Sequence, residues 1–196
     1  MKKITLLAFL AFSLNAFSQQ WTVKMPAPTA RSYAEAAVVN GKIYVISGGT
    51  TSGLTTIVEE YDPVTDTWTT KNSIPTARGE FCVATVNGII YAIGGYTGAV
   101  GTNVVEAYDP VTDLWSTKAP MPTTRSQISC GVINGKIYVV GGWPGTYNIL
   151  EEYDPALDQW TTKSPAQVGR EENNGAAVLN NQLYFIGGKN QLIKYN

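Results

Sequence analysis

The chain has 196 residues and a formal net charge of -1, so its charge balance gives no reason to expect a nucleic acid or an anionic membrane as partner. It contains no histidine, which excludes most hydrolytic triads and most catalytic zinc sites. Its two cysteines are too few for a disulfide scaffold or a thiolate metal site, and we expect neither a metal nor another cofactor.

The first segment, residues 1–18, has the pattern of a secretory signal peptide. Lys2 and Lys3 precede an apolar run from Ile4 to Leu14, which is too short for a membrane span. Ala16-Phe17-Ser18 places small residues at the -3 and -1 positions of a cleavage site after Ser18. We therefore expect an exported mature domain, residues 19–196, that is periplasmic, displayed on the cell surface or secreted. The alternative is a buried N-terminal helix.

The mature chain opens with one short strand, Trp21 to Lys24, and then starts a four-strand unit. Ala34 to Val39 is a run of small and apolar residues, and Asn40-Gly41 after it predicts a tight hairpin turn, because both central residues of such a turn need positive φ. Ile43 to Ile46 is apolar at every position, which predicts a strand buried on both faces. Gly48-Gly49 ends this second strand.

The second half of the unit follows a loop of variable sequence. A third strand is expected over Ile57 to Tyr61, and a turn over Asp62 to Asp66, where Pro63 sets φ. Trp68 opens the fourth strand. Four antiparallel strands in a unit of this length are typical of one blade of a β-propeller.

This unit recurs four times along the chain. Its landmarks are the Gly-Gly pairs at 48–49, 94–95, 141–142 and 187–188 and the tryptophans Trp21, Trp68, Trp115 and Trp160. We expect an all-β propeller of four blades, with repeats at about 25–72, 73–119, 120–164 and 165–196, the last completed by 20–24. The middle of each first strand carries small residues, as the narrow centre of a propeller requires.

The combination of Arg31, Asn40-Gly41, Gly48-Gly49, Tyr61-Asp62-Pro63 and Trp68 resembles the kelch repeat. The resemblance covers essentially all of the mature chain, and it implies a propeller. Kelch propellers generally have five to seven blades, whereas this chain supplies four repeats. When Trp21 to Lys24 is counted as a fourth strand, the chain contains four copies each of the first, second, third and fourth strand of the unit. We therefore expect the N-terminal strand to close a four-blade ring. The alternatives are a fragment of a larger propeller and two open chains that pair into one ring.

Ligand sites in kelch propellers lie on the face that carries the variable loops and the central mouth, so the resemblance places candidate residues there. Tyr96, Trp143 and Tyr147 lie on the loops between the second and third strands, and exposed aromatic residues beside polar groups suit sugars or peptides. The alternative for Trp143 is packing on a neighbouring loop. Residues that differ between blades at one offset should line the mouth: Tyr33, Glu80, Gln127 and Asn173.

Four arginines hold similar positions just before the first strand of each unit: Arg31, Arg78, Arg125 and Arg170. They could form a cationic ring around the mouth that binds carboxylates. The alternative is structural, because Glu59, Glu106 and Glu151 also recur and would pair with them inside the scaffold. Similarly, Cys82 and Cys130 lie on adjacent inner strands, where either a disulfide or two small buried thiols would fit.

These features favour a binding module whose loop face binds a protein, peptide or carbohydrate ligand. One alternative is an enzyme, because bacterial N-acetylneuraminate mutarotases are exported kelch proteins. Such an enzyme needs an acid–base group and an arginine for the sugar carboxylate, for which Glu80 and Arg125 are the candidates. The other alternative is a structural module of a cell-surface assembly.

Overall fold

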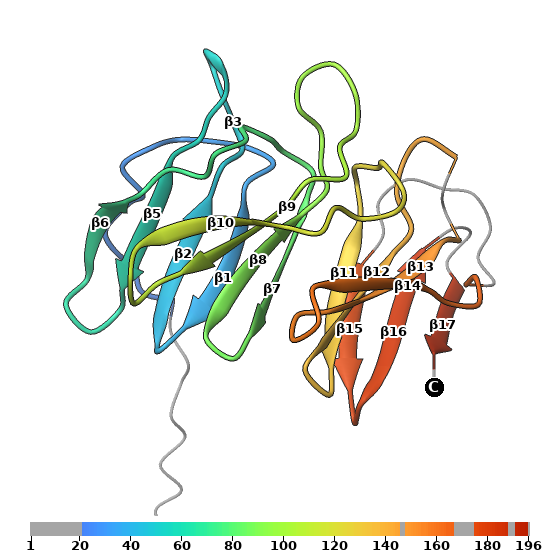
Figure 1. Ribbon diagram of the computed structural model, residues 1–196. Coiled ribbons are helices and arrows are strands. Elements are labelled where there is room, and N and C mark those ends of the chain that lie inside the picture. Colours follow the sequence, from blue (N-terminus) through green and yellow to red (C-terminus); the bar gives the residue numbers. More distant parts are fainter. Residues whose placement is uncertain (1–20, 146–147, 167–174, 188–190, 196) are drawn as a thin grey trace, which may run out of the picture.

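The computed structural model describes residues 21–145, 148–166, 175–187 and 191–195, and these form strands and no helix (Figure 1). The predicted signal peptide lies outside the described residues. Among the residues that are described, no helix is long and apolar enough to cross a membrane.

The strands form four antiparallel sheets, one per repeat, arranged as the four blades of a β-propeller. Blade 1 contains β1 (Glu35–Val39), β2 (Lys42–Ile46), β5 (Val58–Asp62) and β6 (Thr67–Lys71). Blade 2 contains β7 (Cys82–Val86), β8 (Ile89–Ile93), β9 (Val105–Asp109) and β10 (Leu114–Lys118). Blade 3 contains β11 (Ser129–Ile133), β12 (Lys136–Val140), β13 (Leu150–Asp154) and β14 (Gln159–Thr162). Blade 4 contains β15 (Gly175–Leu179), β16 (Gln182–Gly187) and β17 (Gln191–Tyr195). A hairpin of β3 (Gly49–Thr50) and β4 (Gly53–Leu54), which the sequence does not predict, lies within one loop of blade 1.

The first turn of each blade has the geometry that its sequence predicts. Asn40 and Gly41 have φ of 51° and 76°, and the pairs Asn87-Gly88 and Asn134-Gly135 repeat these values closely. Asn tolerates this left-handed region and Gly is unrestricted in it, which explains why Asn-Gly joins the first two strands. The turn fixes the register of β1 on β2, in which Val39 pairs with Lys42 and Ala37 with Tyr44.

The core lies between the blades rather than within any one of them. Ile46 and Val58 of blade 1 pack against Ile90 and Ala92 of blade 2, and all four side chains are buried. Comparable clusters join blade 2 to blade 3 and blade 3 to blade 4. In a blade that has a neighbour on each side, the second strand therefore packs into the core with both of its faces. This agrees with its uninterrupted apolar sequence.

The small residues of the first strands are required by close packing at the centre. A Cβ atom on Gly131 would lie 2.7 Å from Val178 Cγ2 and 2.8 Å from Leu183 Cδ1. Any larger side chain at this position would separate β11 from the fourth blade. The prediction of small residues at the narrow part of the propeller is thus confirmed by the geometry.

A repeated clamp joins each of blades 1, 2 and 3 to the segment that precedes it. Tyr108 Oη and the backbone N–H of Asn72 both donate to Asp113 Oδ1 at 2.6 and 3.0 Å, and Trp115 Nε1 donates to the Asn72 carbonyl at 2.9 Å. Blade 3 repeats the clamp with Ala119, and blade 1 repeats it with Met25. The chain that leaves the last strand of one blade is therefore fixed to the outer strands of the next.

The expected closure of the ring by Trp21 to Lys24 is not present. These residues form no strand, Trp21 is fully exposed, and the fourth sheet contains three strands within the described part of the chain. The innermost strands pack in the order β1, β7, β11, β15, and among these described strands no comparable packing joins β15 back to β1. Figure 1 accordingly shows blade 1 and blade 4 at opposite ends of the array. The sequence predicts the number and order of the strands in each blade, but these do not determine the rotation between neighbouring blades.

Candidate functional site

Three of the four residues expected at the mouth lie in the described part of the structure and share one backbone conformation. Tyr33, Glu80 and Gln127 have φ of 55°, 55° and 53°, a left-handed region that residues other than Gly rarely adopt. The N–H of Glu80 donates to the Tyr33 carbonyl at 3.4 Å, and the N–H of Gln127 donates to the Glu80 carbonyl at 2.8 Å. These three residues therefore follow one another from blade to blade along the mouth. The fourth, Asn173, lies outside the described residues.

Two loop aromatics are held beside this row by main-chain hydrogen bonds. The N–H of Tyr96 donates to the Gly79 carbonyl at 2.7 Å, and the N–H of Trp143 donates to the Ser126 carbonyl at 2.9 Å. The Trp143 side chain is 43% exposed, so its ring is presented to solvent from a fixed backbone. The third predicted aromatic, Tyr147, lies outside the described residues.

These loop and mouth residues form one pocket of about 290 Å³. It lies between blades 2 and 3 and is lined by Glu80, Tyr96, Ser126, Gln127 and Trp143. Four of these five residues are sequence candidates; Ser126 is the one that the sequence reasoning missed. Ser126 lies between Arg125 and Gln127, directly before the position of the repeat at which the residue type varies between blades. This position is the signal that could have identified it.

The side chain of Gln127, one of the residues that line this pocket, has an unsatisfied acceptor. Its Oε1 atom is buried and has no hydrogen-bond partner among the described residues. A buried amide oxygen without a partner costs free energy, which a donor on a bound molecule would recover. The pocket thus combines aromatic rings with acceptor groups of Glu80 and Gln127.

The arginines Arg31, Arg78 and Arg125 are paired inside the blades. Their Nη2 atoms lie 2.6, 2.7 and 2.7 Å from carboxylate oxygens of Glu59, Glu106 and Glu151, and the side chains of all six residues are nearly or fully buried. This is the structural arrangement offered as the alternative in the sequence analysis. Arg170 lies outside the described residues.

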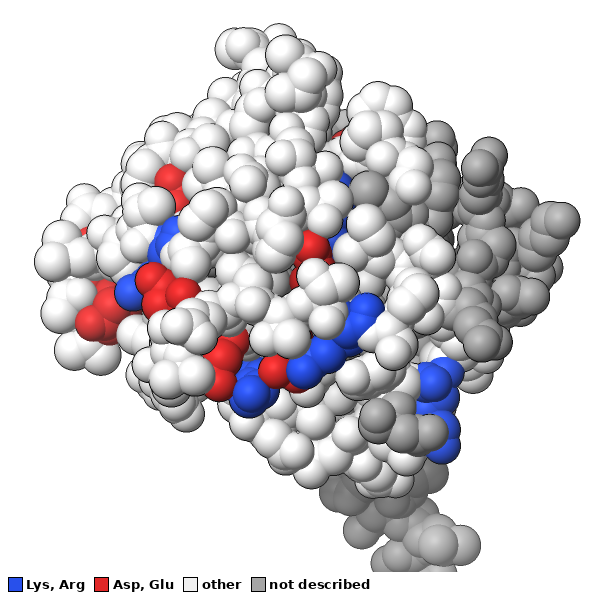
Figure 2. Space-filling model, turned by 45° about the vertical axis from the view of Figure 1, so that its right-hand side comes forward, with Lys and Arg blue, Asp and Glu red and all other residues white. Residues whose placement is uncertain are grey.

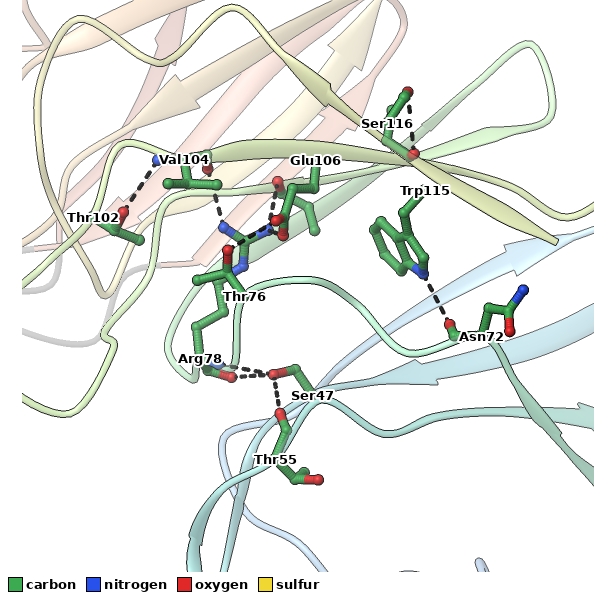
Figure 3. A network of polar contacts seen from close by, with 12 residues as sticks. Ser47, Thr55, Asn72, Thr76, Arg78, Thr102, Val104, Glu106, Trp115 and Ser116 are labelled. Carbon is green, nitrogen blue, oxygen red and sulfur yellow. Dashed lines mark hydrogen bonds and ion pairs between the residues drawn. The ribbon is translucent and has the colours of Figure 1, made fainter.

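The network around Arg78 shows why this ion pair belongs to the scaffold (Figure 3). Arg78 Nη1 and Nη2 donate to the carbonyls of Val104 and Ala92, each at 3.2 Å, while Thr76 Oγ1 donates to the second oxygen of Glu106 at 2.8 Å. The segment that leads from blade 1 is thereby bound to the middle strands of blade 2. The guanidinium group is engaged on several sides and does not face the pocket's solvent.

A second cavity, of about 280 Å³, lies among the first residues of the inner strands and includes Glu35, Cys82, Ser129 and Cys130. Burial raises the pKa of Glu35 to about 7, so this carboxyl group exchanges a proton near neutral pH. Cys82 and Cys130 are free thiols on neighbouring inner strands, and the Cys130 thiol donates to the Val83 carbonyl at 3.3 Å. No group of three or more His, Cys, Asp or Glu that could hold a metal occurs in the described ranges.

Charged side chains on the outer surface are mixed in sign rather than gathered into a patch. Figure 2 shows Lys or Arg next to Asp or Glu in a row across one face. Lys42 and Lys71 both pair with Glu60, at 2.6 and 3.9 Å, and Lys136 and Lys163 both pair with Glu152, at 3.1 and 3.0 Å. This surface provides no single-sign field that would attract a polyanion.

Four-strand sheets, Asn-Gly turns, Gly-Gly strand ends and the recurring Tyr and Trp positions together define a β-propeller of the kelch type. A family model described as the KLHDC2/KLHL20/DRC7 Kelch-repeats domain matches residues 3–142, and a model described as the Kelch motif matches residues 124–167. The chain belongs to the kelch-repeat family. The predicted family and the all-β propeller fold are thereby confirmed.

Comparison with solved structures gives a similar fold. A structure described as "Structure of YjhT" matches with a TM-score of 0.77 at 19% sequence identity, covering 89% of this chain and 64% of that chain. The present chain thus spans less than two thirds of the length of YjhT, and at this identity the likeness concerns the fold alone. No curated protein matches the chain.

Proposed function

We propose that this chain is an exported binding module whose pocket between blades 2 and 3 holds a neutral glycan. The kelch propeller fold supports a binding module in general, and kelch propellers generally bind proteins. The observation that carries the glycan proposal is the convergence of Trp143, Tyr96, Glu80 and Gln127 on one pocket. Aromatic rings stack on the apolar face of a sugar, and its hydroxyl groups are donors for the carboxylate of Glu80 and for the unpartnered Gln127 Oε1.

The charges around the pocket favour a neutral ligand over a sugar acid. Glu80 is the one charged residue among the described residues that line it. Arg125, the candidate for binding a carboxylate, is fully buried and paired with Glu151 at 2.7 Å. A sugar acid would bring its carboxylate toward Glu80, and no cationic side chain among the described residues that line the pocket would compensate it. This weighs against a sugar-acid mutarotase, and we expect no acceleration of N-acetylneuraminate mutarotation measured by NMR.

The binding test uses the mature chain on a glycan array and on a peptide array, followed by calorimetry with the best ligand. We expect Trp143→Ala to weaken binding at least about tenfold, since a central aromatic anchor contributes on the order of 1.4 kcal/mol or more. Gln127→Leu should weaken it in the same direction because it removes the acceptor while retaining the size. Trp21→Ala is the matched control, as Trp21 is exposed and is not among the residues that line the pocket.

Two results would contradict this proposal. Binding that is unchanged in Trp143→Ala would exclude the pocket, and binding confined to the peptide array would replace the glycan by a protein ligand. Export is tested separately by sequencing the N-terminus of the protein recovered outside the cytoplasm, which we expect to begin at Gln19.

A further inference from the structure

Blades 1 and 3 carry the same cluster of charged side chains across their second, third and fourth strands. In blade 1, Glu60 Oε2 accepts from the Tyr44 hydroxyl at 2.7 Å and lies 3.9 Å from Lys71 Nζ. Glu60 Oε1 accepts from Lys42 Nζ at 2.6 Å, and this ammonium group also lies 3.8 Å from Asp62. One carboxylate and one ammonium group thus form the centre of the cluster, between a tyrosine, a second lysine and an aspartate.

Blade 3 repeats this cluster at the same positions of its strands. Glu152 pairs with Lys136 and Lys163 at 3.1 and 3.0 Å. Glu152 also accepts a hydrogen bond from Tyr138, and Lys136 lies 3.2 Å from Asp154. In both sheets the tyrosine stands directly opposite the glutamate in the register. The cluster is therefore a repeated feature of the scaffold in these two blades.

Blade 2 lacks the two central charges of the cluster but keeps the groups around them. The register places Ala107 opposite Tyr91, where the other two blades have glutamate. Ile89 takes the place of the lysine that pairs with the aspartate. The second lysine and the aspartate are retained as Lys118 and Asp109. A carboxylate and an ammonium group are thus missing from a cluster whose other members are present.

Two of the retained groups have unused bonding capacity. Among the residues that the structure describes, the Tyr91 hydroxyl has no hydrogen-bond partner and Lys118 forms no ion pair. The hydrogen bond from Tyr153, and after it the charge of Lys118, lower the pKa of Asp158 in blade 3. The counterpart of Lys118 in blade 1 combines the corresponding interaction with an ion pair to glutamate. Lys118 can therefore accommodate a carboxylate in the same way.

The substitutions in blade 2 leave a cavity of about 310 Å³ at this place. Tyr91 and Ala107 contribute to its lining, and Lys118 and Asp109 are the charged residues among the described residues that line it. Asp109 accepts from the backbone N–H of Val111 at 2.9 Å, but it lacks the lysine that its counterparts pair with. A ligand that carries both a carboxylate and an ammonium group would complement this lining better than an ion of either sign.

Apolar side chains form another part of the lining. Ile89 stands where the other two blades have lysine, and Leu114 stands where they have Thr67 and Gln159. Leu114 is 61% exposed. The blade that lost the ion pair therefore also gained an apolar surface beside the cavity, against which an apolar group of a ligand can pack.

We propose that this cavity binds a free α-amino acid with an apolar side chain. The carboxylate of the amino acid takes the position of the missing glutamate carboxylate and accepts from the Tyr91 hydroxyl and Lys118 Nζ. Its ammonium group takes the position of the missing lysine, next to Asp109, and its side chain packs on Ile89 and Leu114.

The spacing of the two charges in an amino acid fits this position. One carbon atom joins the ammonium and carboxylate groups, which sets their N···O separation at about 2.7 Å. The lysine–glutamate pairs that occupy the position in blades 1 and 3 have N···O separations of 2.6 and 3.1 Å. The inference is independent of the proposed glycan pocket, which is lined by other residues.

Calorimetry of the purified mature chain with leucine, leucinamide and N-acetylleucine tests the chemistry of the ligand. We expect leucine to bind. Leucinamide, which lacks the carboxylate, and N-acetylleucine, which lacks the ammonium group, should each bind at least about tenfold more weakly. Absence of leucine binding would overturn the proposal, and so would equal binding of leucinamide. Equal binding of N-acetylleucine would also overturn it and would indicate the C-terminal carboxylate of a peptide instead.

Variants of the cavity test its location, with circular dichroism to confirm that each is folded. Ala107→Glu restores the glutamate of the other blades and should abolish leucine binding, because the introduced carboxylate takes the place of the ligand beside Tyr91 and Lys118. Lys118→Met should weaken leucine binding at least about tenfold. The matched control is Lys71→Met, altered at the same position of blade 1, which should bind leucine as the wild type does.

Unchanged leucine binding in Ala107→Glu or in Lys118→Met would contradict the proposed site, as would an equal loss in Lys71→Met. Ala107→Glu should retain the binding of a glycan to the pocket between blades 2 and 3. The two proposals therefore fail separately.

Discussion

At the scale of single residues, the positions that recur in every blade serve the scaffold, and the positions that vary form the pocket. Arg31, Arg78 and Arg125 are paired with glutamates beneath the surface. Glu80 and Gln127, which differ at one offset, line the same pocket. Comparing the repeats of one chain thus separates the two kinds of residue without any other sequence.

The buried ion pair gives a prediction for stability. Arg78→Met should lower the free energy of unfolding by about 3–5 kcal/mol, because Glu106 would remain buried without its cation. The double variant Arg78→Met with Glu106→Leu should lose less, since no unpaired charge remains in the core. Urea unfolding of both variants checks this, and a double variant that is less stable than Arg78→Met would contradict it.

At the scale of elements, the sequence predicted strands well because each is bounded by residues with a specific backbone role. The predicted strand Ala34 to Val39 corresponds to β1 at Glu35–Val39, and Ile57 to Tyr61 to β5 at Val58–Asp62. The hairpin of β3 and β4 was missed because its two-residue strands carry no apolar alternation. Glu35 was also missed as a cavity residue, although a carboxylate at the start of an otherwise small and apolar strand is a readable signal.

The Gly-Gly pairs give a prediction at this scale. Gly95 has φ of 109°, and a Cβ there would lie 2.7 Å from Phe81 Cβ and 2.8 Å from the Gly79 carbonyl oxygen. Gly95→Ala should therefore destabilise the protein by about 2–5 kcal/mol, combining left-handed strain with overpacking. Gly88→Ala is the control, since Gly88 has φ of 80° but no atom within 4 Å of its Cβ position. It should cost only about 1–2 kcal/mol in thermal or urea unfolding, and equal losses would contradict the role of close packing.

At the scale of the whole molecule, the four blades lie around a common centre, and each contacts the blades next to it in the sequence. Blades 2 and 3 are covered on both faces, whereas blades 1 and 4 each leave one apolar face open. The sequence predicted the number of blades but not their mutual rotation, because rotation is set by side-chain packing across each boundary. The prediction that Trp21 to Lys24 closes the ring was wrong for this reason. Four of the residues that line the pocket were predicted, because their positions depend only on the order of the repeats.

The rate of hydrogen exchange, measured by mass spectrometry, should depend on the position of each blade in the sequence of four. We expect the slowest exchange in β8 and β12, which lie in the doubly covered blades, and faster exchange in β2 and β16, because local opening at the ends disrupts only one boundary. Uniform exchange across all four blades in a dilute sample would show instead that the array opens as a single unit.

The clamp that Tyr, Asp and Trp form between each of blades 1, 2 and 3 and the segment before it has a consequence for how the length of such a protein can change. Met25, Asn72 and Ala119 make the same main-chain contacts with the blade that follows them. An insertion or deletion of one whole period therefore preserves every joint, whereas a change of a few residues in the clamp segment breaks one. Gene duplication in register would thus lengthen this architecture without redesigning any of its connections.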